Sequence, residues 1–139
     1  MLYIKKKAGG KRMRILIVDD NPKVKCKWVK EVLSEKKVMY DICTCICDAL
    51  KTLYENTNKY QALILDMELP ICKNNKTTVT HGGIEILKKI EKRDIVIPTI
   101  INSTMYLKDE DFEGIKGFYG IIPIFSQREF LKNFISQIS

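Results

Sequence analysis

In two short segments of this chain, a run of aliphatic residues is followed directly by carboxylates. Residues 15–18 (ILIV) run into Asp19 and Asp20, and residues 62–65 (ALIL) run into Asp66 about fifty positions later. An unbroken apolar run of four or five residues is typical of a strand buried on both faces. Open α/β sheets place their ligands at the carboxyl ends of such strands. Three carboxylates at one such edge would bind a hard cation and offer one carboxylate for chemistry.

The cation that these three acids favour is Mg²⁺, which prefers oxygen ligands and usually takes one or two carboxylates together with a phosphate oxygen. Without a cation, converging carboxylates repel one another and raise one another's pKa. A bound Mg²⁺ would remove this penalty and neutralise a phosphoryl donor, so that Asp66 could attack it as a nucleophile. The structural alternative is that Asp19, Asp20 and Asp66 are ordinary turn residues.

The elements that would position these acids alternate between strand and helix. We expect strands over residues 13–18, 38–45, 62–65, 95–101 and 117–122. We expect helices over about 22–35, 48–55, 83–90 and 130–138, and a short, weak one over 107–115. Asn21 would cap the first helix with Pro22 at its first position, and Asp48 would cap the second.

This alternation predicts an α/β fold with a five-stranded parallel sheet, doubly wound with right-handed crossovers into a three-layer sandwich. The first and third strands would then be neighbours, so Asp19, Asp20 and Asp66 would converge. The length of 139 residues fits one domain. Residues 71–82 form an enlarged loop beside the acids, polar and mobile over 73–78, in which His81 is exposed and inert.

Composition and charge narrow the class of protein. No apolar run reaches the length of a membrane span, so we expect a cytoplasmic protein without membrane contact. Much of the net charge of +7 lies in residues 1–12, a basic and flexible arm. A solvated tail is favoured there over a contact with nucleic acid or an acidic partner.

The five cysteines are expected to be free. Cys43, Cys45 and Cys47 alternate, which would place them on one side of a strand, a poor geometry for a tetrahedral zinc site. With Cys26 and Cys72 they would act as small buried hydrophobes, in keeping with a reducing compartment.

Together, these segments resemble the receiver domain of bacterial two-component response regulators, including the stand-alone chemotaxis type. The resemblance covers about residues 13–138 within a single domain at 13–139. Residues 15–21 (ILIVDDN) match the acidic-pair segment of the family, and residues 63–70 (LILDMELP) match its phosphoacceptor segment. Residues 83–90 resemble the third helix, and residues 97–103 the fourth strand. The fold implied is the flavodoxin-like (βα)5 sandwich.

The resemblance implies roles for individual residues. Asp66 would accept a phosphoryl group from a sensor histidine kinase or phosphotransfer protein, Ser103 would be the switch hydroxyl, and Tyr119 the aromatic switch on the fifth strand. Mg²⁺ would be held by Asp19, Asp20, Asp66 and the backbone carbonyl of Glu68. Phosphorylation would change the face made by the fourth helix, fifth strand and last helix.

Such a receiver is not an enzyme, although it catalyses its own phosphorylation and slow dephosphorylation. Its output protein is unknown, DNA contact would need an output domain not present here, and a homodimer is left open.

The sequence departs from the family at Ile122, where a lysine usually precedes the proline. Lys108 and Lys116 are the candidates to replace its charge, and the Ile122–Pro123 bond is expected to be cis, as the equivalent bond often is. Without this lysine, the alternative function is a pseudo-receiver, a phosphorylation-independent protein-interaction module. A phosphatase with an aspartyl-phosphate intermediate and a nucleic-acid binder are less favoured, because we find neither a second acid with a substrate cap nor a basic recognition helix.

Overall fold

A parallel sheet of five strands forms the centre of the molecule. The structure, a computed structural model, describes residues 13–139, so the predicted basic arm at 1–12 lies outside the described residues. The strands of this sheet are β1 (Arg14–Val18), β2 (Met39–Cys43), β3 (Ala62–Leu65), β6 (Thr99–Ile101) and β7 (Phe118–Ile121). Their order is β2-β1-β3-β6-β7, and every neighbouring pair is parallel. The predicted fold class is therefore confirmed.

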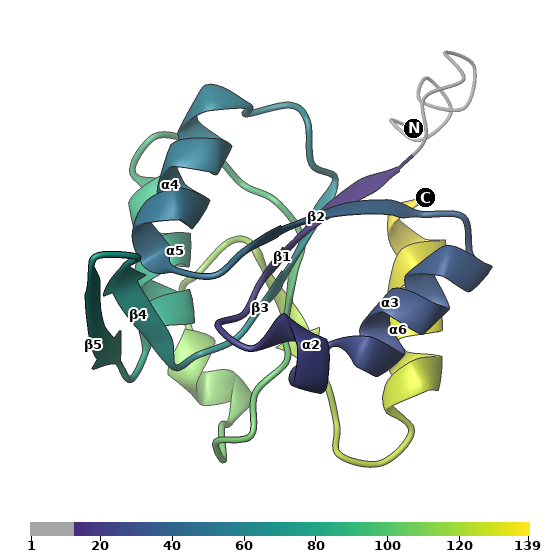
Figure 1. The fold of residues 1–139 in the computed structure, drawn as a ribbon. Coiled ribbons are helices and arrows are strands. Elements are labelled where there is room, and N and C mark those ends of the chain that lie inside the picture. Colours follow the sequence, from purple (N-terminus) through teal and green to yellow (C-terminus); the bar gives the residue numbers. More distant parts are fainter. Residues whose placement is uncertain (1–12) are drawn as a thin grey trace.

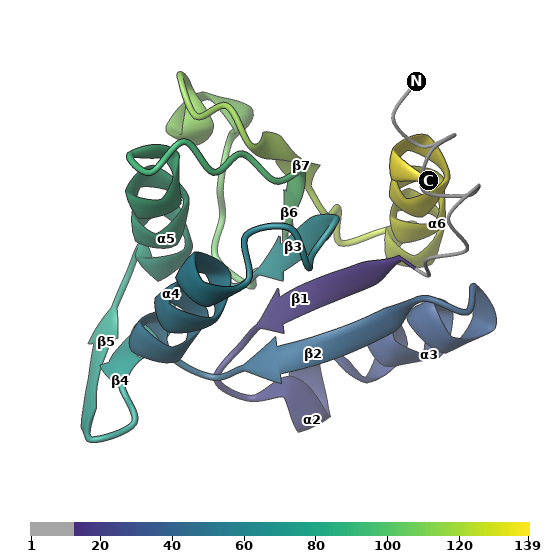
Figure 2. The same cartoon turned by 90° about the horizontal axis from the view of Figure 1, so that it is seen from above.

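Helices cover both faces of this sheet (Figures 1 and 2). On one side lie α3 (Lys27–Glu35) and α6 (Gln127–Ile138), and on the other α4 (Ile46–Glu55) and α5 (Gly82–Glu91). Successive residues of β1 point to opposite faces: Ile15 and Ile17 join the core under α3 and α6, whereas Leu16 and Val18 join the core under α4 and α5. This is why the apolar runs show no alternation.

The first predicted helix is divided into two pieces. Helix α2 (Pro22–Lys25) has Pro22 at its start, as predicted, and a break at Cys26 separates it from α3. Asn21 is at the cap position, but its side chain makes no capping bond; its backbone N–H donates to Asp19 Oδ1 at 2.8 Å. The prediction that Asp48 caps the second helix is wrong, because α4 starts at Ile46 and Cys45 holds the cap position.

The segment predicted as an irregular loop contains a β-hairpin. Strand β4 (Leu69–Cys72) pairs antiparallel with β5 (Asn75–Val79), and the hairpin lies against α4 and α5 (Figure 1). Thr77, Thr78 and Val79 are β-branched residues that favour a strand even though most of β5 is exposed. The loop prediction for 73–78 is wrong for this reason: exposed strand residues carry no apolar pattern.

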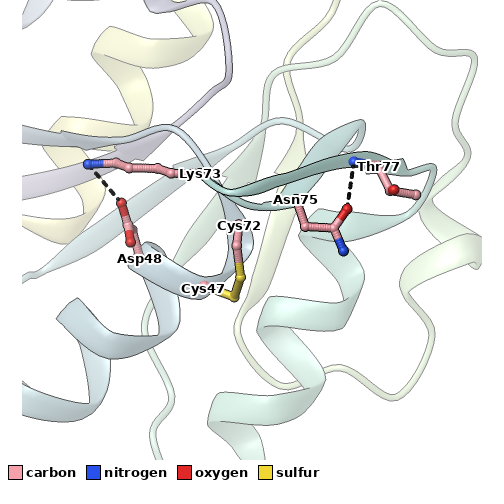
Figure 3. The surroundings of a disulfide bond; sticks show 6 residues. All are labelled: Cys47, Asp48, Cys72, Lys73, Asn75 and Thr77. Carbon is pink, nitrogen blue, oxygen red and sulfur yellow. Dashed lines mark hydrogen bonds and ion pairs between the residues drawn. A yellow bond between two sulfur atoms is a disulfide. The ribbon is translucent and has the colours of Figure 1, made fainter.

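The prediction of five free cysteines is wrong for two of them. Cys47 and Cys72 form a disulfide that joins α4 to the hairpin (Figure 3). Strand β2 ends at Cys43, so Cys45 and Cys47 do not continue its alternation. Cys26, Cys43 and Cys45 are free, and two of these, Cys26 and Cys45, are fully buried as predicted.

Three further differences concern the carboxyl-terminal half. The strand predicted over 95–101 is reduced to β6, because residues 95–98 are not part of a strand. The short helix predicted over 107–115 is only the 3₁₀ turn η1 (Asp109–Phe112). The Ile122–Pro123 bond is trans, as are all peptide bonds between described residues, so the cis prediction is wrong. None of the described helices is long and apolar enough to cross a membrane.

Candidate phosphoacceptor site

The three predicted acids meet at the carboxyl ends of β1 and β3. These strands pair in register up to Val18 and Leu65, and the Asp66 N–H continues the ladder by donating to the Val18 carbonyl at 2.9 Å. Asp19 is 1% exposed and Asp66 2%, whereas Asp20 faces solvent. One carboxylate oxygen of each acid lies within 4.8 Å of the others. The predicted convergence is confirmed.

Asp19 is tied to the helix that follows it. Its Oδ1 accepts the Asn21 N–H, and its Oδ2 accepts the Cys26 S–H at 3.5 Å. Burial raises the pKa of Asp19, and the charge of Asp66 adds to this, outweighing the bond from Asn21. Burial and the neighbouring Asp19 raise the pKa of Cys26 to about 12, so Cys26 is a thiol and not a thiolate at neutral pH.

Lys25 supplies the cation of the site, and the sequence interpretation missed it. Its Nζ lies 2.7 Å from Asp66 Oδ2 and 3.6 Å from Asp20 Oδ1. Burial lowers the pKa of Lys25, but its hydrogen bond to Asp66 and the charges of the three acids outweigh this and raise it. The other carboxylate oxygen of this residue, Asp66 Oδ1, accepts the Met67 N–H at 2.8 Å. Both carboxylate oxygens of Asp66 are therefore held in place.

The two lysines proposed from the sequence lie elsewhere. Lys108 holds the cap position before η1, where its N–H donates to Asp111, and the Lys116 N–H donates to Glu91. A signal for Lys25 existed: it stands in the first helical turn after the acidic pair, and helical side chains point back toward the amino-terminal end of their helix.

The donor set fits a divalent cation. Three carboxylates and one ammonium leave two negative charges, and the exposed Asp20 leaves room for the water ligands that Mg²⁺ retains. Glu68, whose carbonyl was predicted to complete the set, is an exposed residue just before β4. Its role stays a prediction.

Ser103 stands beside a pocket at the edge of the site. The Asn102 N–H donates to the Leu65 carbonyl at 2.8 Å, which places Ser103 just past the end of β6, next to β3. The Ser103 Oγ accepts the Met105 N–H at 3.2 Å. Ser103 and Lys25 line the same pocket, of about 610 Å³, together with Trp28 and Ile122. Its role as the switch hydroxyl stays a prediction.

Tyr119 lies on the edge strand β7 and packs on α6. Its ring is 4.7 Å from that of Phe134 and 6.5 Å from that of Phe130, and its hydroxyl donates to Gln137. These contacts would have to change if Tyr119 moved with phosphorylation, and that movement stays a prediction. His81 is exposed at the cap position of α5, as expected.

Solved structures similar to this one are receiver domains. A signal receiver domain from Vibrio parahaemolyticus has 22% identity and a TM-score of 0.72, with 92% of this chain and 90% of that chain covered. The non-phosphorylated HemR receiver domain from Leptospira biflexa has 26% identity and a TM-score of 0.67, with 92% and 95% covered. The chemotaxis protein CheY4 from Vibrio cholerae has 17% identity and a TM-score of 0.68, with 93% and 100% covered.

No protein-family model matches the chain, and a search of curated proteins finds no match. The strand order, the acids at the ends of β1 and β3, and the near-complete coverage of these structures agree with one another. The chain has the fold of a response regulator receiver domain.

Proposed function

We propose that this chain is a phosphoacceptor switch of a two-component phosphorelay. The observation that carries the proposal is the placement of Asp66: buried at the end of β3, among two further acids, with Lys25 on one oxygen and a backbone N–H on the other. An aspartate that only formed a turn would need neither the burial nor the neighbouring acids and Lys25. Similar solved structures that are receiver domains support the same function.

In the proposed reaction, a carboxylate oxygen of Asp66 attacks the phosphorus of a phosphohistidine on a kinase or phosphotransfer protein. The new O–P bond forms as the P–N bond breaks, and the histidine nitrogen keeps the electron pair. Mg²⁺, when bound by Asp19, Asp20, Asp66 and the Glu68 carbonyl, supplies charge neutralisation for the phosphoryl oxygens. The chain catalyses at most this transfer and its own slow dephosphorylation.

The output of the switch is a change in protein contacts. Ser103 would bond the phosphoryl group, and Tyr119 would exchange its contacts on α6 for new ones. Because η1 is one 3₁₀ turn, the responding face would consist mainly of β7 and α6. The histidine kinase that this function requires draws on cytoplasmic ATP, so we place the chain in the cytoplasm. The redox state of Cys47 and Cys72 in cells tests this placement.

The experiment is intact-mass analysis after incubation with acetyl phosphate and Mg²⁺. We expect one phosphoryl adduct on the wild type, none on Asp66→Asn, and none on either when a chelator removes the metal. An unreactive wild type that also fails to bind Mg²⁺ would contradict the proposal and favour the pseudo-receiver, for which the uncharged Ile122 is the supporting observation.

A further inference from the structure

The place from which the family's lysine would come is occupied by an apolar side chain that belongs to the core. Ile122 is 7% exposed and lies in the same buried cluster as Leu131 and Phe134 of α6. It offers no charge to Asp66. If the site needs a positively charged side chain in addition to a metal, that side chain must come from another element.

That cation comes from α2, the short helix that follows β1. Lys25 Nζ makes a charge-assisted hydrogen bond of 2.7 Å with Asp66 Oδ2, and its side chain is 29% exposed, so it is neither free nor locked in the core. Phosphoryl oxygens on Asp66 would lie only two bonds beyond the carboxylate oxygen that Lys25 contacts. A long, flexible ammonium side chain can follow that displacement.

Charge also favours a role for Lys25 in the phosphorylated state. Phosphorylation replaces the single negative charge of Asp66 by about −1.5 to −2. The ammonium contacts Asp66 Oδ2, two bonds from the phosphoryl oxygens that would carry this charge, in a site where Asp66 is almost fully buried. Its attraction therefore grows as the phosphoryl group arrives, which is the requirement for accelerating the transfer.

The pocket beside Lys25 also supports a role for this residue. Lys25 lines one pocket together with Ser103 and also contacts Asp66 Oδ2, so the ammonium connects the acids with the pocket that holds the predicted switch hydroxyl. We propose that Lys25 binds the phosphoryl group on Asp66 and so replaces the lysine missing at Ile122. This inference rests on the proposed function and names the residue that completes its site.

A different role for the same contact would be replacement of the metal by the ammonium. Two features argue against it. Lys25 stands 3.6 Å from Asp20, beyond hydrogen-bond distance, and its single charge leaves two negative charges on the acids. Lys25 and a divalent cation together neutralise the acids, whereas Lys25 alone does not.

The test uses Lys25→Met and Lys25→Arg, with Lys23→Met as the matched control, because Lys23 is an exposed lysine on the same helix. Three quantities are measured: Mg²⁺ affinity, affinity for beryllium trifluoride as a non-covalent phosphoryl mimic, and the rate of adduct formation with acetyl phosphate. Trp28 reports both affinities through its fluorescence, since it is the single tryptophan and lines the pocket with Lys25.

We expect Lys25→Met to bind Mg²⁺ at least as tightly as the wild type, because a competing positive charge is removed. Its affinity for beryllium trifluoride and its adduct rate should both fall about tenfold or more, the usual effect of losing a hydrogen bond to a charged group. Lys25→Arg should retain most of both, and Lys23→Met should match the wild type. Urea unfolding verifies the fold; if Lys25→Met does not fold, Lys25→Gln takes its place.

Wild-type rates and mimic affinity in Lys25→Met would overturn the inference and leave the proposed function intact. A faster adduct rate in that variant would also overturn it, since Lys25 would then be a competitor of the metal. An unreactive wild type that still binds Mg²⁺ would overturn this inference, because Lys25 would then not replace the missing lysine. An unreactive wild type that also fails to bind Mg²⁺ would overturn the proposed function as well.

Discussion

Breaking the disulfide between Cys47 and Cys72 should lower the stability of the whole domain. The bond closes a loop with a sequence separation of 25 residues. In the chain-entropy treatment, a loop of this length restricts the unfolded chain by about 3.5 kcal/mol of free energy at 25 °C. The nearby ion pair of Lys73 with Asp48, at 3.2 Å, also joins the hairpin to α4 (Figure 3). It is exposed and contributes about 0–1 kcal/mol, too little to replace the stability that the disulfide provides.

The assay is urea unfolding of the oxidised chain and of the same chain in reductant. With a denaturant slope of about 2 kcal/mol per molar, the midpoint should fall by about 1–2 M on reduction. The control is the Cys47→Ser/Cys72→Ser variant, whose midpoint should equal that of the reduced wild type and should not respond to reductant.

Thiol labelling in denaturant verifies the starting state: the oxidised chain should label at three cysteines and the reduced chain at five. Equal midpoints for chains that differ in this labelling would refute the reasoning, because they would mean that the cross-link does not restrict the unfolded chain. Five labelled cysteines before reduction would refute the bond itself.

Three further predictions follow from the contacts of single residues. Asp19→Asn should stabilise the metal-free chain by about 0.5–2 kcal/mol in urea, because it removes a buried charge whose pKa is raised by burial and by Asp66. The pKa of Asp41 is lowered below its ordinary 3.8: burial raises it, but the bond from the Tyr60 hydroxyl and two basic side chains outweigh burial. The stability that Asp41 contributes is therefore fully present above its ordinary pKa of 3.8 and is lost as the pH falls through the lowered pKa. Acid should for this reason destabilise the wild type more than Asp41→Asn. Gly83→Ala should destabilise by about 1–3 kcal/mol and slow phosphorylation, since its Cβ would lie 2.6 Å from the Asp66 carbonyl oxygen.

The centre of the sheet could be predicted because β1 and β3 are buried on both faces. Residues 15–18 and 62–65 are apolar without interruption, and a parallel sheet covered by helices is the structure that buries such runs. The position of the acids followed from the same fact: once β1 and β3 are neighbours, Asp19 and Asp66 must leave the sheet at the same edge.

The hairpin and its disulfide could not be predicted in the same way. Strand β5 has its residues mostly in solvent, so its pairing with β4 leaves no periodic apolar signal. The pairing of Cys47 with Cys72 depends on that hairpin lying against α4, a contact between segments that spacing alone does not bring together. The prediction of a short helix over 107–115 is wrong for a related reason. Phe112 is buried by stacking on Phe118, at 4.3 Å between ring centroids, and a single turn is enough to place it there.

Lys25 shows why a missing residue in a motif is weak evidence for a missing charge. The sequence has no lysine at position 122, but a cation is needed at a point in space and not at a position in the chain. Helix α2 delivers it although the helix has four residues and buries none of them. What fixes α2 is its beginning: Asp19 accepts the Asn21 N–H, and Pro22 sets the direction of the first turn.

This attachment joins Asp19, one of the three acids, to the helix that carries Lys25. Any cation that draws Asp19 Oδ1 toward itself weakens the bond to Asn21, which holds the start of the helix that carries Lys25. A lysine on the β7 side would be independent of that bond, because it would stand on a different strand. We therefore expect metal binding at the acids to shift the position of the Lys25 ammonium. The Mg²⁺ titration of the wild type and Lys25→Arg, followed by Trp28, is the measurement in which that link would be visible.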